Sequence, residues 1–102
     1  QFVEAARGFA QRIVQHGNDD AARIRWAFLE ALSRPPSDKE QALVVKTLAR
    51  ERSRYVADNE RALKVLSPGE STRDTTIPAA EHAAWMQVAT LILNLSETMT
   101  RN

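Results

Sequence analysis

The stretch from Pro78 to Arg101 constrains the fold most, because it is a long helix-forming run that is apolar on almost every side. A thin polar stripe interrupts it, made of Gln87, Thr90, Asn94 and Thr98. A helix that lies in water needs a wide polar face, so a helix patterned in this way must be surrounded by other elements of a core or by a partner. We therefore expect Trp85 and the leucines of this run to be buried.

Four further helical segments are predicted from apolar spacing and capping signals. They cover residues 1–16, about 19–34, 38–56 and about 59–66, and the last of these either continues the third with a kink or stands alone. The clearest signal is Ser37 followed by Glu40, a capping box in which each side chain satisfies a free backbone N–H. The sequence predicts an all-α domain of four to five helices packed around a buried C-terminal helix, with one long polar loop before it.

The ends and inner faces of these segments are also predicted. The second segment is expected to be capped by Asn18 or Asp19, and the fourth by Asp58. The first segment is expected to end at Gly17 in a left-handed conformation. Arg34 should close the second segment before two prolines. The buried side of the third segment is predicted to hold Leu43, Val44, Thr47, Leu48 and Tyr55, and that of the fourth Ala62, Leu63 and Leu66.

Composition narrows the function classes. The 102 residues carry 14 basic and 13 acidic side chains, so a net charge of +1 creates no global field toward nucleic acid or an anionic membrane. The absence of cysteine excludes disulfides, thiolate zinc sites and c-type haem attachment within this chain, and no cofactor is predicted for it. The apolar part of the final helix is too short for a membrane span. The two histidines, His16 and His82, have no metal or nucleophile spacing, so the sequence indicates no catalytic constellation and leaves enzyme activity open.

The loop from Gly69 to Ile77 is the first candidate site. Its polar residues Glu70, Ser71, Arg73 and Asp74 either hold a small anion or hydrogen-bond to neighbouring helix ends, and the second interpretation is favoured. Because Asn94 and Glu97 lie near the end of the last helix, we predict one polar cluster that joins them to Arg73. That cluster would fasten the helix end to the loop.

A second candidate is the surface of the third segment. Lys46, Arg50 and Arg54 repeat every four residues on one face, which is typical of a solvated face with ion pairs and conceivable as a nucleic-acid groove. Interleaved acids and the lack of exposed stacking aromatics weaken the second interpretation. Trp26 lies off the inward stripe of the second segment, where it either covers the rim of the core or anchors a partner.

Three blocks of the chain, taken in order, resemble a known family. They are Asp20–Ile24 with Ala27–Phe28 and Ala31–Ser37, then Pro68–Ser71 with Arg73–Asp74, then Trp85 with Leu93–Thr98 and Thr100–Arg101. Together they are similar to the C-terminal part of large proteins of planctomycetes and related bacteria, the planctomycete cytochrome-C-domain-containing proteins. The resemblance implies an exported, periplasmic or cell-surface protein with an upstream domain that can carry haem. It implies no catalytic residue for this segment.

Three functions are therefore compared as hypotheses. The leading one is a structural or interaction domain at the C-terminus of a multidomain exported protein, whose partners are the upstream domains of the same polypeptide. The second gives residues 69–74 a share in an active or ligand site completed by those domains. The third is weak nucleic-acid binding through the basic face. A fragment with so apolar a final helix is also expected to be capable of forming a homodimer.

Overall fold

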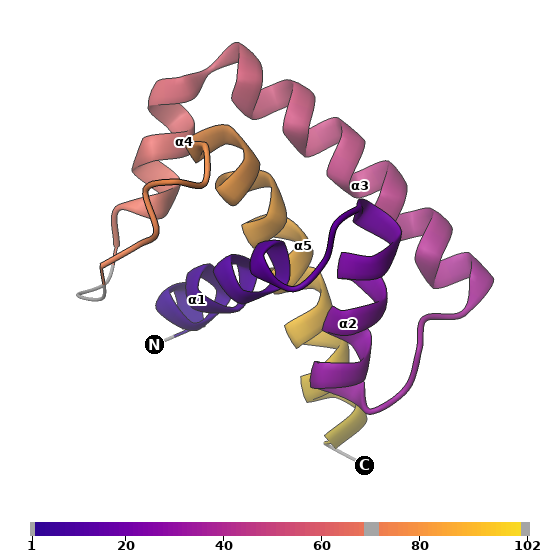
Figure 1. The fold of residues 1–102 in the computed structure, drawn as a ribbon. Coiled ribbons are helices and arrows are strands. Elements are labelled where there is room, and N and C mark those ends of the chain that lie inside the picture. Colours follow the sequence, from indigo (N-terminus) through magenta and orange to yellow (C-terminus); the bar gives the residue numbers. More distant parts are fainter. Residues whose placement is uncertain (1, 69–71, 101–102) are drawn as a thin grey trace.

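The computed structural model describes residues 2–68 and 72–100, and in that part of the chain it contains five α-helices and no strand (Figure 1). The helices are α1 (Phe2–Gln15), α2 (Asp20–Leu32), α3 (Asp38–Ala57), α4 (Asn59–Leu66) and α5 (Ala79–Thr100). The predicted all-α class and the number of helices are confirmed. Asp58 separates α3 from α4 with an extended φ of −142°, so α4 is a helix of its own.

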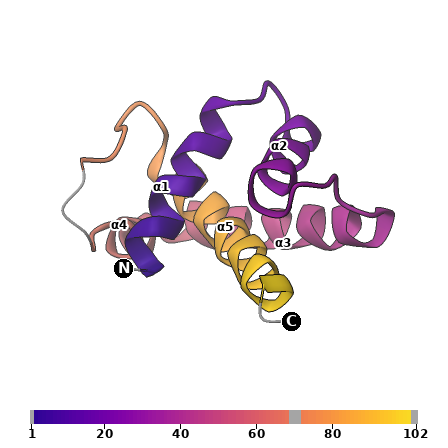
Figure 2. The same cartoon turned by 90° about the horizontal axis from the view of Figure 1, so that it is seen from below.

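The last helix forms the centre of the fold, as its apolar pattern predicts. α5 contacts all four other helices, most extensively α1 and α3. In Figure 2, α3 and α4 follow one another in a row, and α5 crosses this row. Trp85 is completely buried, and so are Ala83, Ala84, Val88 and Ile92. Burial of an indole ring stabilises a fold by several kcal/mol, so this one helix holds much of the core together.

The N-cap predictions are confirmed. The side chain of Asp19 accepts a hydrogen bond from the backbone N–H of Ala22, and Asp58 accepts one from Arg61 at 3.2 Å. In the capping box the Glu40 backbone N–H donates to the Ser37 hydroxyl at 3.1 Å, while the Ser37 N–H donates to the Glu40 carboxylate at 2.9 Å.

Glu40 has a second role in the same turn. Its carboxylate accepts two hydrogen bonds from the Arg34 guanidinium, at 2.7 and 2.9 Å. These bonds, with the Ser37 backbone N–H, lower the pKa of Glu40 to about 2. The turn between α2 and α3 is thus held by one carboxylate that serves both a helix cap and an ion pair.

Two turn predictions are wrong. Gly17 does not adopt the left-handed conformation; it is glycine because a Cβ atom there would lie 2.8 Å from Cγ and 3.0 Å from the backbone nitrogen of Arg23. The left-handed residue is instead Ser33, with φ of 60°, and it ends α2 at Leu32, two residues before the predicted Arg34. Its backbone N–H donates to the Leu29 carbonyl, which satisfies one of the last free acceptors of the helix.

The predicted inner faces are only partly correct. Leu43 on α3 is 52% exposed and Leu63 on α4 is 44% exposed, whereas the charged Glu51 is buried. α3 lies along the edge of the molecule and contacts its neighbours with a single stripe, which consists of Val44, Leu48, Glu51 and Tyr55. An apolar residue one position off that stripe therefore stays in water.

Candidate interaction surface

Arg52 of α3 joins three helices and fixes their relative positions. Its guanidinium donates to the Asp20 carboxylate at the start of α2, at 2.6 and 2.8 Å. It also donates through Nε to both carboxylate oxygens of Glu81 in the first turn of α5, at 3.1 and 3.0 Å. The hydrogen bond from Arg52 lowers the pKa of Asp20. We call Arg52, Asp20 and Glu81 the Arg52 cluster.

The aromatic core adjoins this cluster. The indole N–H of Trp85 donates to Glu81 at 2.9 Å, and the guanidinium carbons of Arg52 and Arg23 lie 5.9 and 6.0 Å from the centre of its ring. Such distances allow cation–π attraction. The sequence did not reveal the cluster, because its members come from three elements separated by about 30 residues each.

A groove of about 390 Å³ lies between α3 and α5. On α3 it is bordered by the buried Glu51 and by a stripe directly beside the buried one, in which each residue stands one position before its buried neighbour. The remaining border comes from the polar stripe of α5, together with Leu91. The lining residues are Leu43, Thr47, Arg50, Glu51 and Arg54 of α3 and Gln87, Thr90, Leu91 and Asn94 of α5. We call this the α3–α5 groove.

Glu51 organises the cationic side of the groove. Its side chain is only 8% exposed, and its two carboxylate oxygens pair with Arg50 at 3.2 Å and Arg54 at 3.4 Å. A buried carboxylate needs such partners to compensate for its lost hydration. The arginine side chains remain 67% and 46% exposed, so the pairing orders them while leaving their charge accessible. Lys46 is exposed one turn before Arg50 and is not among the residues that line the groove.

The α5 side of the groove is uncharged. Gln87 donates to the Tyr55 hydroxyl at 3.1 Å, and the Thr90 hydroxyl donates back to the Met86 carbonyl at 2.9 Å. Leu91 is half-buried, so its side chain offers apolar area opposite the exposed Leu43. The groove therefore combines one cationic wall, one neutral polar wall and leucines from both helices.

The structure brings Lys46, Arg50 and Arg54 together on one helix but separates Trp26 from them. The Trp26 ring stacks on His16 with 4.1 Å between ring centres and 12° between planes, and it tilts against Phe9 at 6.1 Å. It is half-buried between α1 and α2. This position corresponds to the predicted rim of the core, and anchoring of a partner by Trp26 stays a prediction.

The loop residues are fastened to α1 rather than to the far end of α5. The Asp74 backbone N–H donates to the Gln11 side chain at 2.8 Å, and its carboxylate accepts from Gln15 at 3.1 Å. Hydrogen bonds from the Thr76 hydroxyl and backbone N–H lower the pKa of Asp74. Glu70 and Ser71 lie outside the described residues, so their predicted role in this loop is untested.

Asn94 and Glu97 lie far from residues 72–77, the described part of this loop. Asn94 lies fifteen residues after Ala79, which corresponds to about 22 Å along a helix axis, and Figure 1 shows residues 72–77 at the first end of α5, away from its last turns. Arg73 is half-buried near the start of α5. The structure thus corrects the prediction of a single polar cluster that joins Arg73 to the helix end, because α5 itself holds the two groups apart. A shared ligand site at the loop stays a prediction.

A buried polar junction between α1, α4 and α5 was not predicted. The Arg7 guanidinium donates to the Leu66 carbonyl at 2.7 Å, and His82 Nε2 donates to the Arg7 carbonyl at 3.0 Å. His82 is completely buried, and its Nδ1 atom has no hydrogen-bond partner among the described residues. Burial lowers the pKa of His82; Arg73 and Arg7 nearby act in the same direction, whereas the bond to the Arg7 carbonyl and the charge of Asp74 oppose it.

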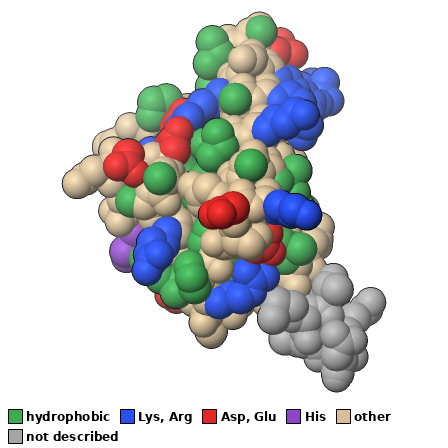
Figure 3. Space-filling model, turned by 90° about the vertical axis from the view of Figure 1, so that its right-hand side faces the viewer, with side chains coloured by type: hydrophobic (Ala, Val, Ile, Leu, Met, Phe, Trp, Pro, Cys, Tyr) green, Lys and Arg blue, Asp and Glu red, His purple; other side chains and the backbone are tan. Residues whose placement is uncertain are grey.

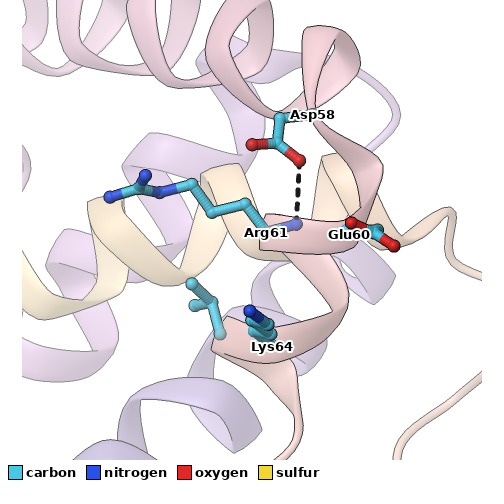
Figure 4. A pocket seen from close by; sticks show the side chains of 5 residues that line it. Asp58, Glu60, Arg61 and Lys64 are labelled. Carbon is cyan, nitrogen blue, oxygen red and sulfur yellow. Dashed lines mark hydrogen bonds between the residues drawn. The ribbon is translucent and has the colours of Figure 1, made fainter.

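A second pocket, of about 400 Å³, lies at the corner between α3 and α4 (Figure 4). It is lined by Asp58, Glu60, Arg61, Lys64 and Val65. Asp58 already caps α4, and Glu60 and Arg61 point in opposite directions from this helix. Two acids and two bases at an open corner give no preference for either sign of charge. The α3–α5 groove is the better candidate site.

Fold and groove together define an all-α, five-helix domain with a mixed cationic and apolar groove. No protein-family model matches the chain, and comparison with curated proteins and with solved structures finds no significant similarity. Among the helices of residues 2–68 and 72–100, none is both long and apolar enough to cross a membrane. The same residues contain no group of three or more acids and histidines placed to hold a metal ion.

Proposed function

We propose that this chain is a structural and protein-interaction domain that forms the C-terminal part of a larger exported bacterial protein and acts by contact rather than by chemistry of its own. The observation that carries the proposal is the α3–α5 groove, in which exposed leucine and ordered arginine side chains lie together. Arginine is enriched at the centres of protein interfaces, and apolar side chains beside it provide the area that drives association.

The rigidity of the groove supports the proposal. Its two walls belong to helices that the Arg52 cluster joins directly, and Glu51 restrains the arginines before any partner arrives. A preformed surface loses less conformational entropy on binding than a mobile one. The domain therefore offers a contact surface whose shape is set by its own fold.

Site-specific photocrosslinking in the complete polypeptide tests this function. A benzoylphenylalanine replaces Leu43 in the groove, and the control replaces Leu29 on α2, which is similarly exposed at 42% and lies outside the groove. Both variants are first checked for an unchanged melting temperature. We expect crosslinks from position 43 to residues beyond the 102 of this domain, identified by mass spectrometry, and several-fold fewer from position 29.

Two results would contradict the proposal. Equal crosslinking from both positions would mean that the groove has no preference for a partner. Absence of crosslinks from position 43 in the folded polypeptide would mean that the groove faces solvent.

A further inference from the structure

The walls of the α3–α5 groove restrict the chemistry of the segment that fits between them. We propose that its occupant is an acidic amphipathic helix of about three turns, contributed by a partner segment; this inference rests on the proposed function. Such a helix places leucine-like side chains against Leu43 and Leu91, and carboxylates against the basic wall of α3. Binding of an amphipathic helix in a groove between two helices is a recurrent mode of recognition.

The length of the occupant follows from the lining residues. On α3 they run from Leu43 to Arg54, about 16 Å along the helix axis, and on α5 from Gln87 to Asn94, about 10 Å. A helix of 11 residues matches the longer wall. The two walls are themselves helices, so a third helix laid along them continues the same ridge-and-groove packing.

The sign of its charge follows from the basic wall. Arg50 and Arg54 stand four residues apart, about 6 Å along α3, and Glu51 neutralises only one of their two charges. Carboxylates one turn apart on a partner helix have the same spacing. The uncharged α5 wall adds no competing charge, so attraction comes from one side and also sets the rotation of the bound helix about its axis.

The same observations favour a helix over nucleic acid. Phosphate backbones need an extended cationic track, whereas here the arginines flank a buried carboxylate and the groove between them and α5 is partly apolar. On the face shown in Figure 3, basic side chains form separate groups with hydrophobic and acidic side chains between them. A leucine-bearing helix can use this mixture, and a polyphosphate cannot.

A designed peptide provides the test. The probe is a fluorescein-labelled, end-capped peptide of 14 residues with three leucines on one face, glutamates beside them and alanines elsewhere; its control has lysine in place of every glutamate. Binding to the intact domain is measured by fluorescence anisotropy at low and high salt. We expect micromolar affinity for the acidic probe and at least tenfold weaker binding of the lysine probe.

Charge reversal locates the binding site. Arg50→Glu reverses one cation of the α3 wall and leaves Arg54 to pair with Glu51, and Arg25→Glu makes the same change at an exposed position of α2. We expect about tenfold weaker binding of the acidic probe by the Arg50 variant and less than a twofold change for the Arg25 variant. Equal effects of both variants, or equal binding of both peptides, would overturn the inference.

Two other outcomes also overturn it. Tighter binding of a 16-base-pair DNA duplex, with a steep salt dependence that Arg50→Glu reduces, would assign the basic face to nucleic acid. Self-association in sedimentation experiments that Leu43→Ser abolishes would assign the groove to a second copy of this chain. The two proposals fail separately: crosslinks from position 43 without peptide binding would refute the acidic helix alone, and absence of both would refute the interaction function as well.

Discussion

Replacing Arg52 by methionine is predicted to destabilise the fold by about 2–3 kcal/mol. The methionine keeps an unbranched stem against Trp85 but loses the hydrogen bonds to Asp20 and Glu81. A hydrogen bond to a charged group contributes about 1.5–3 kcal/mol when well shielded. The side chains of Arg52, Asp20 and Glu81 are 31%, 40% and 27% exposed. Solvent screening therefore reduces the contribution of each of the two ion pairs to about 1–1.5 kcal/mol.

The loss is measured as a shift of the thermal midpoint. For a domain of this size 1 kcal/mol corresponds to about 4–5 °C, so Arg52→Met is expected to lower Tm by about 8–15 °C at pH 7. The matched control Arg25→Met, at an exposed position of α2, should change Tm by less than about 2 °C. A double-mutant cycle with Glu81→Gln should give a coupling energy of about 1 kcal/mol.

The Arg52 cluster also predicts a pH dependence. Because Arg52 lowers the pKa of Asp20 in the folded state, the unfolded chain binds more protons than the folded one around pH 4. The ion pair therefore contributes its full stability above the unfolded pKa of about 3.9, and this contribution is lost as the pH falls below that value. A shift below 3 °C for Arg52→Met at pH 7, or one that persists undiminished at pH 2.5, would refute the assignment of this energy to the ion pairs.

Three further predictions concern single positions. Ser33→Gly should stabilise the domain by about 0.5–1 kcal/mol, since glycine adopts a φ of 60° without steric strain. The control Ser67→Gly, at a residue with a φ of −72°, should destabilise the domain. Chemical denaturation measures both changes. Gly8→Ala should raise stability by about 1 kcal/mol because a Cβ there meets only a flexible side-chain end at 3.8 Å. Gly17→Ala should instead lower stability by about 1–2 kcal/mol, since its Cβ would contact the backbone of Arg23. Stability changes of the same sign for both variants would show that the turn at Gly17 is not as described. Burial lowers the pKa of His82, so the unfolded chain binds a proton more readily than the folded one, and stability should fall as the pH drops below about 6.5. His82→Gln should weaken this pH dependence of the denaturation midpoint, and an unchanged pH dependence would contradict a buried neutral ring.

Local signals were enough to predict the helices. Caps and breakers such as Asp19, Ser37 and Asp58 act within three residues of their own position, so their effect is the same in the sequence and in the fold. The burial of α5 was predictable for a different reason, since a helix without a polar face has only one stable environment. Both predictions depend on properties of one segment alone.

Side-chain roles that require several helices were not predictable. Leu43 and Leu63 have the spacing of inward residues, yet the neighbouring helices cover only part of each apolar face. Glu51 is buried because two arginines accompany it, and Arg52 is structural because α2 and α5 begin beside it. The sequence marked the basic face of α3 as a candidate but gave no indication that a groove runs beside it.

The polar stripe of α5 links the first sequence observation to the candidate site. Gln87, Thr90 and Asn94 interrupt an otherwise apolar helix, and the structure places all three along the α3–α5 groove. A largely buried helix tolerates polar residues only where water or a polar partner can reach it. The stripe therefore marks the side of α5 that its own domain leaves uncovered, and the structure shows that this side forms one wall of the groove. The opposite wall depends on how α3 is rotated about its axis, which is set by the burial of Glu51 and the ion pairs of Arg52.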